Sequence, residues 1–259
     1  MIKFKKMHGN GNDFILIENL TQTISLTKAQ IQKLGDRKKG IGFDQLITIN
    51  PPKKTNHDLY IRFFNTDGSE ASMCLNGVRS VGAFVWEEKL LPKKPTLLGT
   101  RSKEVMIQPT ASKNVKTIID LPSEEKIPQS DMKLLAKELH ACFVNAGNHH
   151  LLIESKNIDS YDLSDLCDRL RKRKFFRDSN ISLWTKSGNS ILARTNEAGA
   201  GETLSCGSAA AAIASIALKK GKGVTVISKG GKISLKSLGN KMEMIGPAEF
   251  ICEGIWQKN

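Results

Sequence analysis

One short pattern occurs twice in this chain, and that repetition limits its possible folds more than any other feature. A glutamate stands four residues before a cysteine in each half, as Glu70 before Cys74 and as Glu202 before Cys206. A glycine-containing stretch precedes each glutamate, and residues with helical spacing follow each cysteine. The two cysteines lie 132 positions apart in a chain of 259 residues. We therefore expect two similar halves, each of which places one cysteine at the start of a helix.

The spacing of apolar residues predicts mixed α and β structure in both halves. In the first half it predicts helices over residues 27–34 and 76–90 and strands within 2–16, 45–49, 59–64, 104–108 and 116–120. In the second half it predicts helices over 162–171 and 209–218 and strands over 142–146, 150–153, 181–185, 191–195, 224–227 and 232–235. Prolines interrupt the pattern within 121–129, which predicts one domain over residues 1–121 and another over residues 122–259.

The chain is basic, with 39 Lys and Arg residues against 26 Asp and Glu residues and a net charge of +13. Such a charge is compatible with a nucleic-acid partner. The lysines are spread along the chain, however, and no zinc-finger spacing, RNA-binding aromatic motif or basic heptad array occurs. We expect no nucleic-acid partner. The alternative is a basic nucleic-acid-binding protein that keeps the fold as a scaffold, and salt-sensitive binding would distinguish it.

The sequence also indicates where in the cell the protein is expected. No apolar run approaches the roughly 20 residues that span a bilayer. Residues 1–6 lack the apolar stretch and the cleavage site of a secretory signal. We therefore expect a cytoplasmic protein without a membrane partner.

Five cysteines are present, an odd number with no Cys-x-x-Cys pair. This argues against a disulfide framework and against a thiolate metal site, so no metal is expected. Three of the five, Cys142, Cys167 and Cys252, are expected to be small buried apolar residues. The matched surroundings of Cys74 and Cys206 single these two out. Glu70 and Glu202 have a simpler alternative role, which is to cap turns and helix donors.

A cysteine at a helix start has an environment that favours its thiolate, because unpaired N–H groups and the helix dipole attract negative charge. The same N–H groups can hold a substrate carboxylate. In this chain they come from residues 75–77 in the first half and from residues 207–209 in the second. Two such helix starts would also stabilise the enolate-like charge that forms when an α-proton leaves.

Two equivalent cysteines suit the inversion of an α-carbon, because inversion needs a base on one face and an acid on the other. We expect one thiolate and one thiol that exchange roles with the direction of the reaction. The predicted partner is a small-molecule amino-acid substrate. No lysine in a Schiff-base context and no phosphate-binding motif is evident, so pyridoxal phosphate is not implied and no cofactor is expected.

Four stretches of sequence together indicate a family. They are His8-Gly9-Asn10-Gly11-Asn12-Asp13-Phe14, Gly40-Ile41-Gly42-Phe43-Asp44-Gln45, Asn65-Thr66-Asp67-Gly68-Ser69-Glu70, and Gly199-Ala200-Gly201-Glu202-Thr203 with Cys206-Gly207-Ser208. With these stretches the chain resembles the diaminopimelate epimerase family over nearly its whole length. The resemblance implies an α/β (α+β) fold of two pseudo-symmetric domains, each a mostly antiparallel sheet wrapped around a central helix. It also implies interconversion of LL- and meso-2,6-diaminopimelate, on the route to lysine and peptidoglycan.

The resemblance further implies roles for individual residues. Cys74 and Cys206 match the catalytic cysteines, and His150 and Glu197 match the pair that tunes the thiols. The residues matching those that line the substrate are Asn12, Gln45, Asn65, Asn148 and Asn180. Asn76, Gly207 and Ser208 match residues whose backbone holds the reacting carboxylate. Because members of the family often form dimers, a homodimer is one expectation.

Three positions depart from the family pattern. Leu75 replaces a glycine after the first catalytic cysteine, which keeps the backbone N–H but puts a bulky side chain at the mouth of the substrate site. His149 replaces a proline. Ala198 replaces the arginine expected to pair with the distal carboxylate of diaminopimelate, a loss of several kcal/mol unless another group replaces it. Arg177 and Arg194 are the two candidates for that replacement.

Two further alternatives remain open. A related racemase that acts on another amino acid, or on several, would share the chemistry, and Leu75 and Ala198 are the residues that favour it. Isomerases of the phenazine-biosynthesis type share the expected fold but lack the cysteine pair, so the presence of both Cys74 and Cys206 argues against this type.

Overall fold

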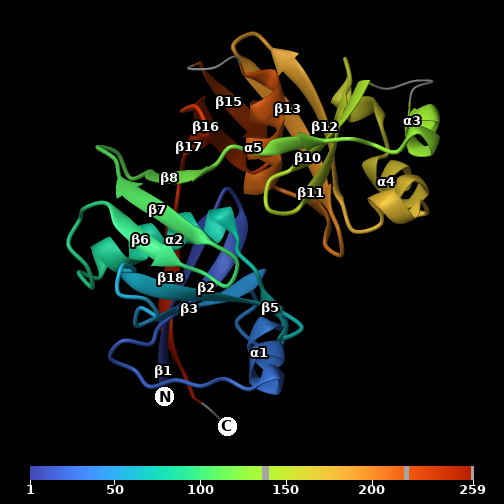
Figure 1. The fold of residues 1–259 in the computed structure, drawn as a ribbon. Coiled ribbons are helices and arrows are strands. Elements are labelled where there is room, and N and C mark those ends of the chain that lie inside the picture. Colours follow the sequence, from blue (N-terminus) through green and yellow to red (C-terminus); the bar gives the residue numbers. More distant parts are fainter. Residues whose placement is uncertain (136–139, 219–221, 258–259) are drawn as a thin grey trace. The chain divides into compact units, whose positions relative to one another are not determined.

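The computed structural model describes residues 1–135, 140–218 and 222–257. By its internal contacts the chain divides into two units (Figure 1). The first comprises Met1–Ile118 together with Ile245–Asn259, and the second comprises Ile119–Met244. Two strands, β8 (Val115–Asp120) and β17 (Lys241–Gly246), span the points of division.

The first unit is a sheet with one long helix against it. Its elements are β1 (Ile2–Gly9), β2 (Asn12–Glu18), α1 (Lys28–Gly35), β3 (Gln45–Asn50), β4 (Leu59–Asn65), β5 (Glu70–Ala71), α2 (Leu75–Glu87), β6 (Thr96–Gly99), β7 (Glu104–Pro109) and β18 (Glu249–Trp256). Strand β1 is antiparallel to β2 and β18, and β3 is antiparallel to β4. The pairs β2–β3 and β4–β6 are parallel.

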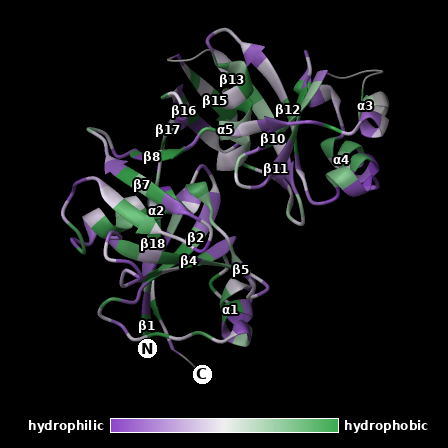
Figure 2. Cartoon of the chain, viewed as in Figure 1, coloured by the Kyte–Doolittle hydropathy of each residue, from purple (hydrophilic) through white to green (hydrophobic). Residues whose placement is uncertain are grey.

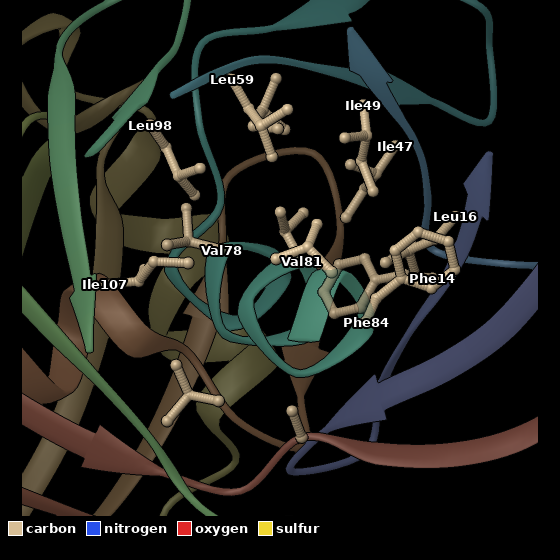
Figure 3. Packing of buried hydrophobic residues seen from close by; sticks show 14 of the residues in the cluster. Phe14, Leu16, Ile47, Ile49, Leu59, Val78, Val81, Phe84, Leu98 and Ile107 are labelled. Atoms are coloured by element: carbon tan, nitrogen blue, oxygen red, sulfur yellow. The ribbon is translucent and has the colours of Figure 1, made fainter. Parts of the chain in front are cut away.

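Helix α2 forms the centre of this unit. Its apolar residues Val78, Val81 and Phe84 recur every three residues, so they share one side of the helix. They pack against buried strand residues such as Phe14 and Ile47 (Figure 3). Burial of one such side chain stabilises the fold by about 1.5–3 kcal/mol. The helix is therefore held by its tertiary packing rather than by helical propensity alone.

The second unit repeats this arrangement. Its elements are β9 (Ser123–Glu125), α3 (Gln129–Leu135), β10 (His140–Asn145), β11 (His149–Glu154), η1 (Ile158–Ser160), α4 (Leu163–Arg171), η2 (Lys174–Phe176), β12 (Asn180–Ser187), β13 (Ser190–Glu197), β14 (Gly201–Thr203), α5 (Gly207–Ala217), β15 (Gly223–Ser228) and β16 (Gly231–Ser237). Strand β10 is antiparallel to β9 and β11. The pairs β11–β12 and β13–β15 are parallel, as β2–β3 and β4–β6 are in the first unit.

The helices α4 and α5 of the second unit differ in how they are buried. Helix α5 consists largely of alanine and is buried from Ala209 to Ala214, which allows strands to approach it closely. Helix α4 is amphipathic, with Leu163, Leu166 and Leu170 buried and polar residues between them, as its mixed colours in Figure 2 show. The expected fold, a mostly antiparallel sheet with a central helix in each half, is confirmed.

The division of the chain differs from the expected domains 1–121 and 122–259 at two places. The first unit ends at Ile118, before the proline-containing segment, and residues 123–125 of that segment form β9. The C-terminal strand β18 groups with the first unit because it pairs with β1, with Ile2 opposite Trp256. The local pattern of residues 249–256 gave no sign of this pairing, because its partner strand lies at the opposite end of the sequence.

The other cysteines do not all follow expectation. All five are free thiols. Cys167 is buried, and burial raises its pKa to about 12, while Cys142 is half-buried. The expectation that Cys252 is buried was wrong: this residue is exposed on β18, where the first five residues all face outwards or lie at the surface. An apolar run in a strand therefore did not imply burial. None of the helices in the described ranges is both long and apolar enough to cross a membrane.

Candidate active site

Three predicted substrate-lining residues of the first unit lie at one edge of its sheet. Asn12 and Gln45 begin the neighbouring strands β2 and β3, and Asn65 ends β4 directly opposite Gln45. Because β2 and β3 are parallel and β4 is antiparallel to β3, these strand ends meet at the same edge. Gln45 Nε2 donates to Asn65 Oδ1 over 3.0 Å, and Asn65 Nδ2 donates to Ser69 Oγ over 3.1 Å.

Cys74 is the N-cap residue of α2, at the position predicted for it. Its half-buried thiol donates to Asn12 Oδ1 over 3.4 Å, and Asn76 Nδ2 donates to the same oxygen over 3.4 Å. Asn12 Nδ2 donates in turn to Asp44 Oδ2 over 2.7 Å, which orients the Asn12 amide. The first half-site thus brings together Cys74, Asn12 and Asn76 around one amide oxygen.

The second unit has an equivalent sheet edge, but different side chains lie along it. His150 and Asn180 lie opposite each other at the start of the parallel pair β11–β12, and Glu197 ends β13. His150 is fully buried, and burial lowers its pKa to about 3, so the imidazole is neutral. Its Nε2 lies 3.0 Å from Asn148 Oδ1, which assigns the proton to Nε2. Its Nδ1 has no hydrogen-bond partner in the described part of the chain.

Cys206 is the N-cap residue of α5 and is buried. Its Sγ lies 3.4 Å from the hydroxyl of Ser208. Burial, with the nearby Glu197 carboxylate, raises the pKa of this thiol well above its ordinary value. Glu197 is oriented by Thr203, whose hydroxyl donates to Glu197 Oε1 over 2.7 Å. Cys206 is therefore a protonated thiol at neutral pH.

The two repeated glutamates do not cap turns or helices. Glu70 accepts two hydrogen bonds of 2.9 Å from Arg62, and Glu202 accepts two of 2.8 Å from Arg194. Each arginine stands eight residues before its glutamate, and each pair ties the strand before the hairpin to the short strand that leads to the cysteine. Sequence reasoning missed these arginines, although their equal distance from the two cysteines was a usable signal.

The positions that depart from the family pattern have distinct surroundings. Leu75 is buried at the first position of α2. His149 stacks on Phe143, with ring centroids 5.4 Å apart. Ala198 is exposed, and its backbone N–H donates to Asn180 Oδ1 over 2.9 Å.

Only one of the two candidate replacement arginines is uncommitted. Arg194 is occupied by Glu202 and also donates to the carbonyls of Ile158 and Tyr161, so four of its five N–H donors are already used. Arg177 follows η2, is exposed, and forms no ion pair with the described residues. Within residues 1–135, 140–218 and 222–257, no group of three or more His, Cys, Asp or Glu side chains is arranged to hold a metal ion.

Comparison with known proteins identifies the family of the chain. A sequence profile described as diaminopimelate epimerase matches residues 4–121 and 142–251. A diaminopimelate epimerase of Blochmanniella floridana is 35% identical over 272 residues, covering 98% of this chain and 99% of that protein. The chain belongs to the diaminopimelate epimerase family. As a member of this family it is an isomerase, and specifically an epimerase.

A second relative supports the family assignment, and a solved structure shows the same fold. A diaminopimelate epimerase of Coxiella burnetii (strain Dugway 5J108-111) is 32% identical over 272 residues, covering 98% of this chain and 99% of that protein. The fold also resembles that of a Bacillus anthracis phenazine biosynthesis protein of the PhzF family. That crystal structure aligns with a TM-score of 0.76 and covers 98% of both chains, and at 15% identity it shows a shared fold alone.

Proposed function

We propose that this protein interconverts LL- and meso-2,6-diaminopimelate by proton transfer at Cα, with Cys74 and Cys206 as the catalytic residues. The observation that carries the proposal is the equivalence of the two cysteines. Each is the N-cap of the central helix of its unit, and each follows a short strand held by an arginine–glutamate pair. Inversion needs a base and an acid on opposite faces of the carbon, and two equivalent thiols supply one of each.

Over one turnover, one proton leaves Cα and one proton returns to it. One thiolate takes the Cα proton and becomes a thiol, and the C–H electron pair passes into the carboxylate as enolate-like charge. The other thiol then gives its proton to Cα from the opposite face and becomes a thiolate. The reverse reaction uses the same steps with the roles exchanged.

The helix starts supply the electrostatic part of this mechanism. The first N–H groups of a helix have no carbonyl partner within the helix, so they are suited to hold an anion. In our proposal the N–H groups of Leu75, Asn76, Gly207 and Ser208 hold the reacting carboxylate. They stabilise the charge that develops on it, a contribution of about 3–4 kcal/mol for one well-placed donor in related chemistry.

Side chains of both units bind the rest of the substrate in this proposal. Those that line it are Asn12, Gln45, Asn65, Asn148 and Asn180. His150 and Glu197 tune the thiols. Because Ala198 offers no cation and Arg194 is occupied, Arg177 is our candidate for the partner of the distal carboxylate.

Steady-state kinetics on LL-diaminopimelate against a panel of L-amino acids with one carboxylate tests the substrate. We expect diaminopimelate to have the highest kcat/KM. Arg177→Ala should raise KM for diaminopimelate roughly tenfold or more with kcat nearly unchanged. Arg169→Ala is the matched control, because Arg169 is an exposed arginine whose ion pair among the described residues is with Asp165, one turn earlier on α4.

A second candidate function is a racemase of another amino acid, and the exposed Ala198 is the observation that favours it. Faster turnover of an amino acid with one carboxylate than of diaminopimelate would establish this function and overturn the first. In that case Arg177→Ala should leave the KM for the amino acid with one carboxylate unchanged. Ala198→Arg should then shift the preference towards diaminopimelate.

A further inference from the structure

The helices that follow the two cysteines differ in one charged residue. Arg79 lies five positions after Cys74 on α2, and the equivalent position after Cys206 on α5 is Ala211. Arg79 is completely buried, which is rare for an arginine. A buried cation close to one thiol and absent from the equivalent place in the other unit makes the two half-sites electrostatically unequal.

In the first unit, two glycines leave the space that the Arg79 guanidinium fills. A Cβ atom added to Gly246 would lie 2.9 Å from Arg79 Nε, and one added to Gly9 would lie 3.4 Å from Arg79 Nη2. The side chain at Gly246 must therefore be absent for the guanidinium to fit. Arg79 Nε donates to the Pro247 carbonyl over 3.3 Å, and Nη1 donates to the Leu75 carbonyl over 3.5 Å.

A short chain of side-chain contacts leads from Arg79 to the sulfur of Cys74. Arg79 Nη2 donates to Asn76 Oδ1 over 2.7 Å. Because the Asn76 oxygen is held by Arg79, its N–H₂ group points the other way, to Asn12 Oδ1, which also contacts Cys74 Sγ. The positive end of the Asn76 amide thus faces the Asn12 oxygen, which accepts from the Cys74 thiol and by itself favours the protonated form. The buried charge of Arg79, one hydrogen bond behind Asn76, acts in the opposite direction and favours the thiolate.

We propose that Arg79 is a positioning residue that makes Cys74 the resting thiolate of the enzyme, while Cys206 rests as the thiol. This inference rests on the proposed function, in which one cysteine is the base and the other the acid. Arg79 acts through its own buried charge, which is held one hydrogen bond from Asn76. It touches no reacting atom.

A second difference between the half-sites acts in the same direction. Asn65 of the first unit and Glu197 of the second both end the strand that precedes the hairpin, 132 positions apart. Cys206 therefore has a carboxylate nearby where Cys74 has a neutral amide. Glu197 and burial raise the pKa of Cys206, while Arg79 and Cys74 attract each other electrostatically. A nearby cation favours a thiolate and a nearby anion disfavours it.

The other charged groups on the elements that pack against α2 mostly have ion-pair partners of their own. Asp44, which holds Asn12, belongs to a set of two anions and two cations with Asp13, Arg37 and Lys6. The remaining sets are Lys5 with Glu88 and Glu253, His8 with Glu249, and Glu104 with Lys54 and His57. These sets leave Arg79 as the charge in direct contact with the Asn76 amide.

The pH dependence of alkylation tests the inference without any substrate. Iodoacetamide labelling of the native protein across a pH series, resolved by mass spectrometry of the Cys74 and Cys206 peptides, gives a midpoint for each thiol. The midpoint is the readout, because restricted access of the reagent slows labelling at every pH without moving the midpoint. We expect a lower midpoint for Cys74 than for Cys206. Arg79→Met should raise the Cys74 midpoint by roughly one pH unit or more and leave the Cys206 midpoint in place.

Two further variants separate charge from packing. Arg79→Lys keeps the positive charge, so its Cys74 midpoint should stay close to that of the wild type. Ser80→Ala is the matched control, because Ser80 is the buried neighbour on α2 and its hydroxyl donates only to the Asn76 carbonyl. If Arg79→Met does not fold, Arg79→Lys carries the test, and a rise of its midpoint to that of an ordinary thiol would overturn the inference.

A folded Arg79→Met with an unchanged Cys74 midpoint would also overturn it, as would a wild-type Cys206 midpoint below that of Cys74. A different result would contradict the proposed function, namely a wild-type protein that does not epimerise diaminopimelate. Because labelling uses no substrate, the two failures are distinguishable.

Discussion

The half-sites of the two units share a backbone and differ in the side chains that carry charge. In both units a parallel strand pair and an antiparallel strand end at one edge, and a cysteine caps the central helix beside a hairpin. The register is equivalent as well: Phe64 pairs with Glu70 as Asn196 pairs with Glu202, each 132 positions apart. The common backbone places both thiols at helix starts.

Three equivalent positions differ in charge or polarity. The buried Phe14 of the first unit corresponds to the buried His150 of the second, since each lies opposite the first residue of the parallel neighbour strand. Asn65 corresponds to Glu197, and Arg79 to Ala211. The backbone repeat therefore accounts for having two thiols, and in our proposal these substitutions make the two thiols unequal. The proposed mechanism needs one thiol to hold a proton while the other lacks one, and unequal thiols fix which of the two holds it at rest.

The largest effect is expected from removing either thiol. Cys74→Ala and Cys206→Ala should each lower the rate of inversion by a factor of about 10³ or more, since general acid–base groups contribute 10²–10⁴-fold each. Measured in heavy water, the wild-type product should gain deuterium at Cα before the substrate does. Equal early labelling of substrate and product would indicate one shared base, and retained inversion in either variant would remove that cysteine from the mechanism.

The arginine–glutamate pairs should differ in their contribution to stability, although their geometry is the same. The side chain of Arg194 is 12% exposed and also binds two carbonyls, whereas that of Arg62 is 42% exposed. We expect Arg194→Met to lower the free energy of unfolding by about 2–3 kcal/mol, because Glu202 keeps Lys229 as a partner but the carbonyls of Ile158 and Tyr161 lose this largely buried donor. Arg62→Met should cost about 1 kcal/mol or less. Urea unfolding of both variants measures this, and equal costs would contradict the difference in burial.

His150 should make the free energy of unfolding depend on pH in the acidic range. Its counterpart Phe14 has no titratable group and cannot do so. Burial lowers the folded pKa of His150 to about 3, below the ordinary 6.5 of the unfolded chain. Between these values the unfolded chain binds a proton that the folded protein does not. Stability therefore falls as the pH falls from about 6.5 towards 3, by up to about 1.4 kcal/mol per pH unit.

His150→Gln keeps an N–H donor for Asn148 and removes this titration. Across that pH window the free energy of unfolding of the variant should therefore decline less steeply than that of the wild type. Denaturant unfolding at several pH values measures both slopes, and parallel slopes would refute the assigned protonation state.

The smallest effect is expected from exchanging the residue that ends the strand before each hairpin. Glu197→Gln should lower the alkylation midpoint of Cys206 by roughly one pH unit, because it removes the carboxylate that disfavours the thiolate. Asn65→Asp places a carboxylate at the equivalent position of the first unit, so it should raise the Cys74 midpoint. If either variant moves its midpoint in the opposite direction, the equivalence of the two positions does not extend to their electrostatics.

The sequence alone determined the features that depend on local pattern. The repeated Glu-x-x-x-Cys units, the helices that follow them and most strands follow from residue spacing, and the structure contains them at the predicted places. Thr27 was expected to begin a helix, and it forms a capping box with Gln30. Family membership also followed from short motifs, because these keep both residue type and spacing.

Only the tertiary structure decided which side chains are buried and what they contact. The pairing of β18 with β1 joins the two ends of the chain, and no local pattern encodes it. In the same way Arg62, Arg79 and Arg194 are three arginines of similar appearance in the sequence. One is half-exposed, one is fully buried against two glycines and one is closed off by a glutamate and two carbonyls. Burial arises from contacts with residues distant in sequence, and it sets how strongly each charge acts on its neighbours.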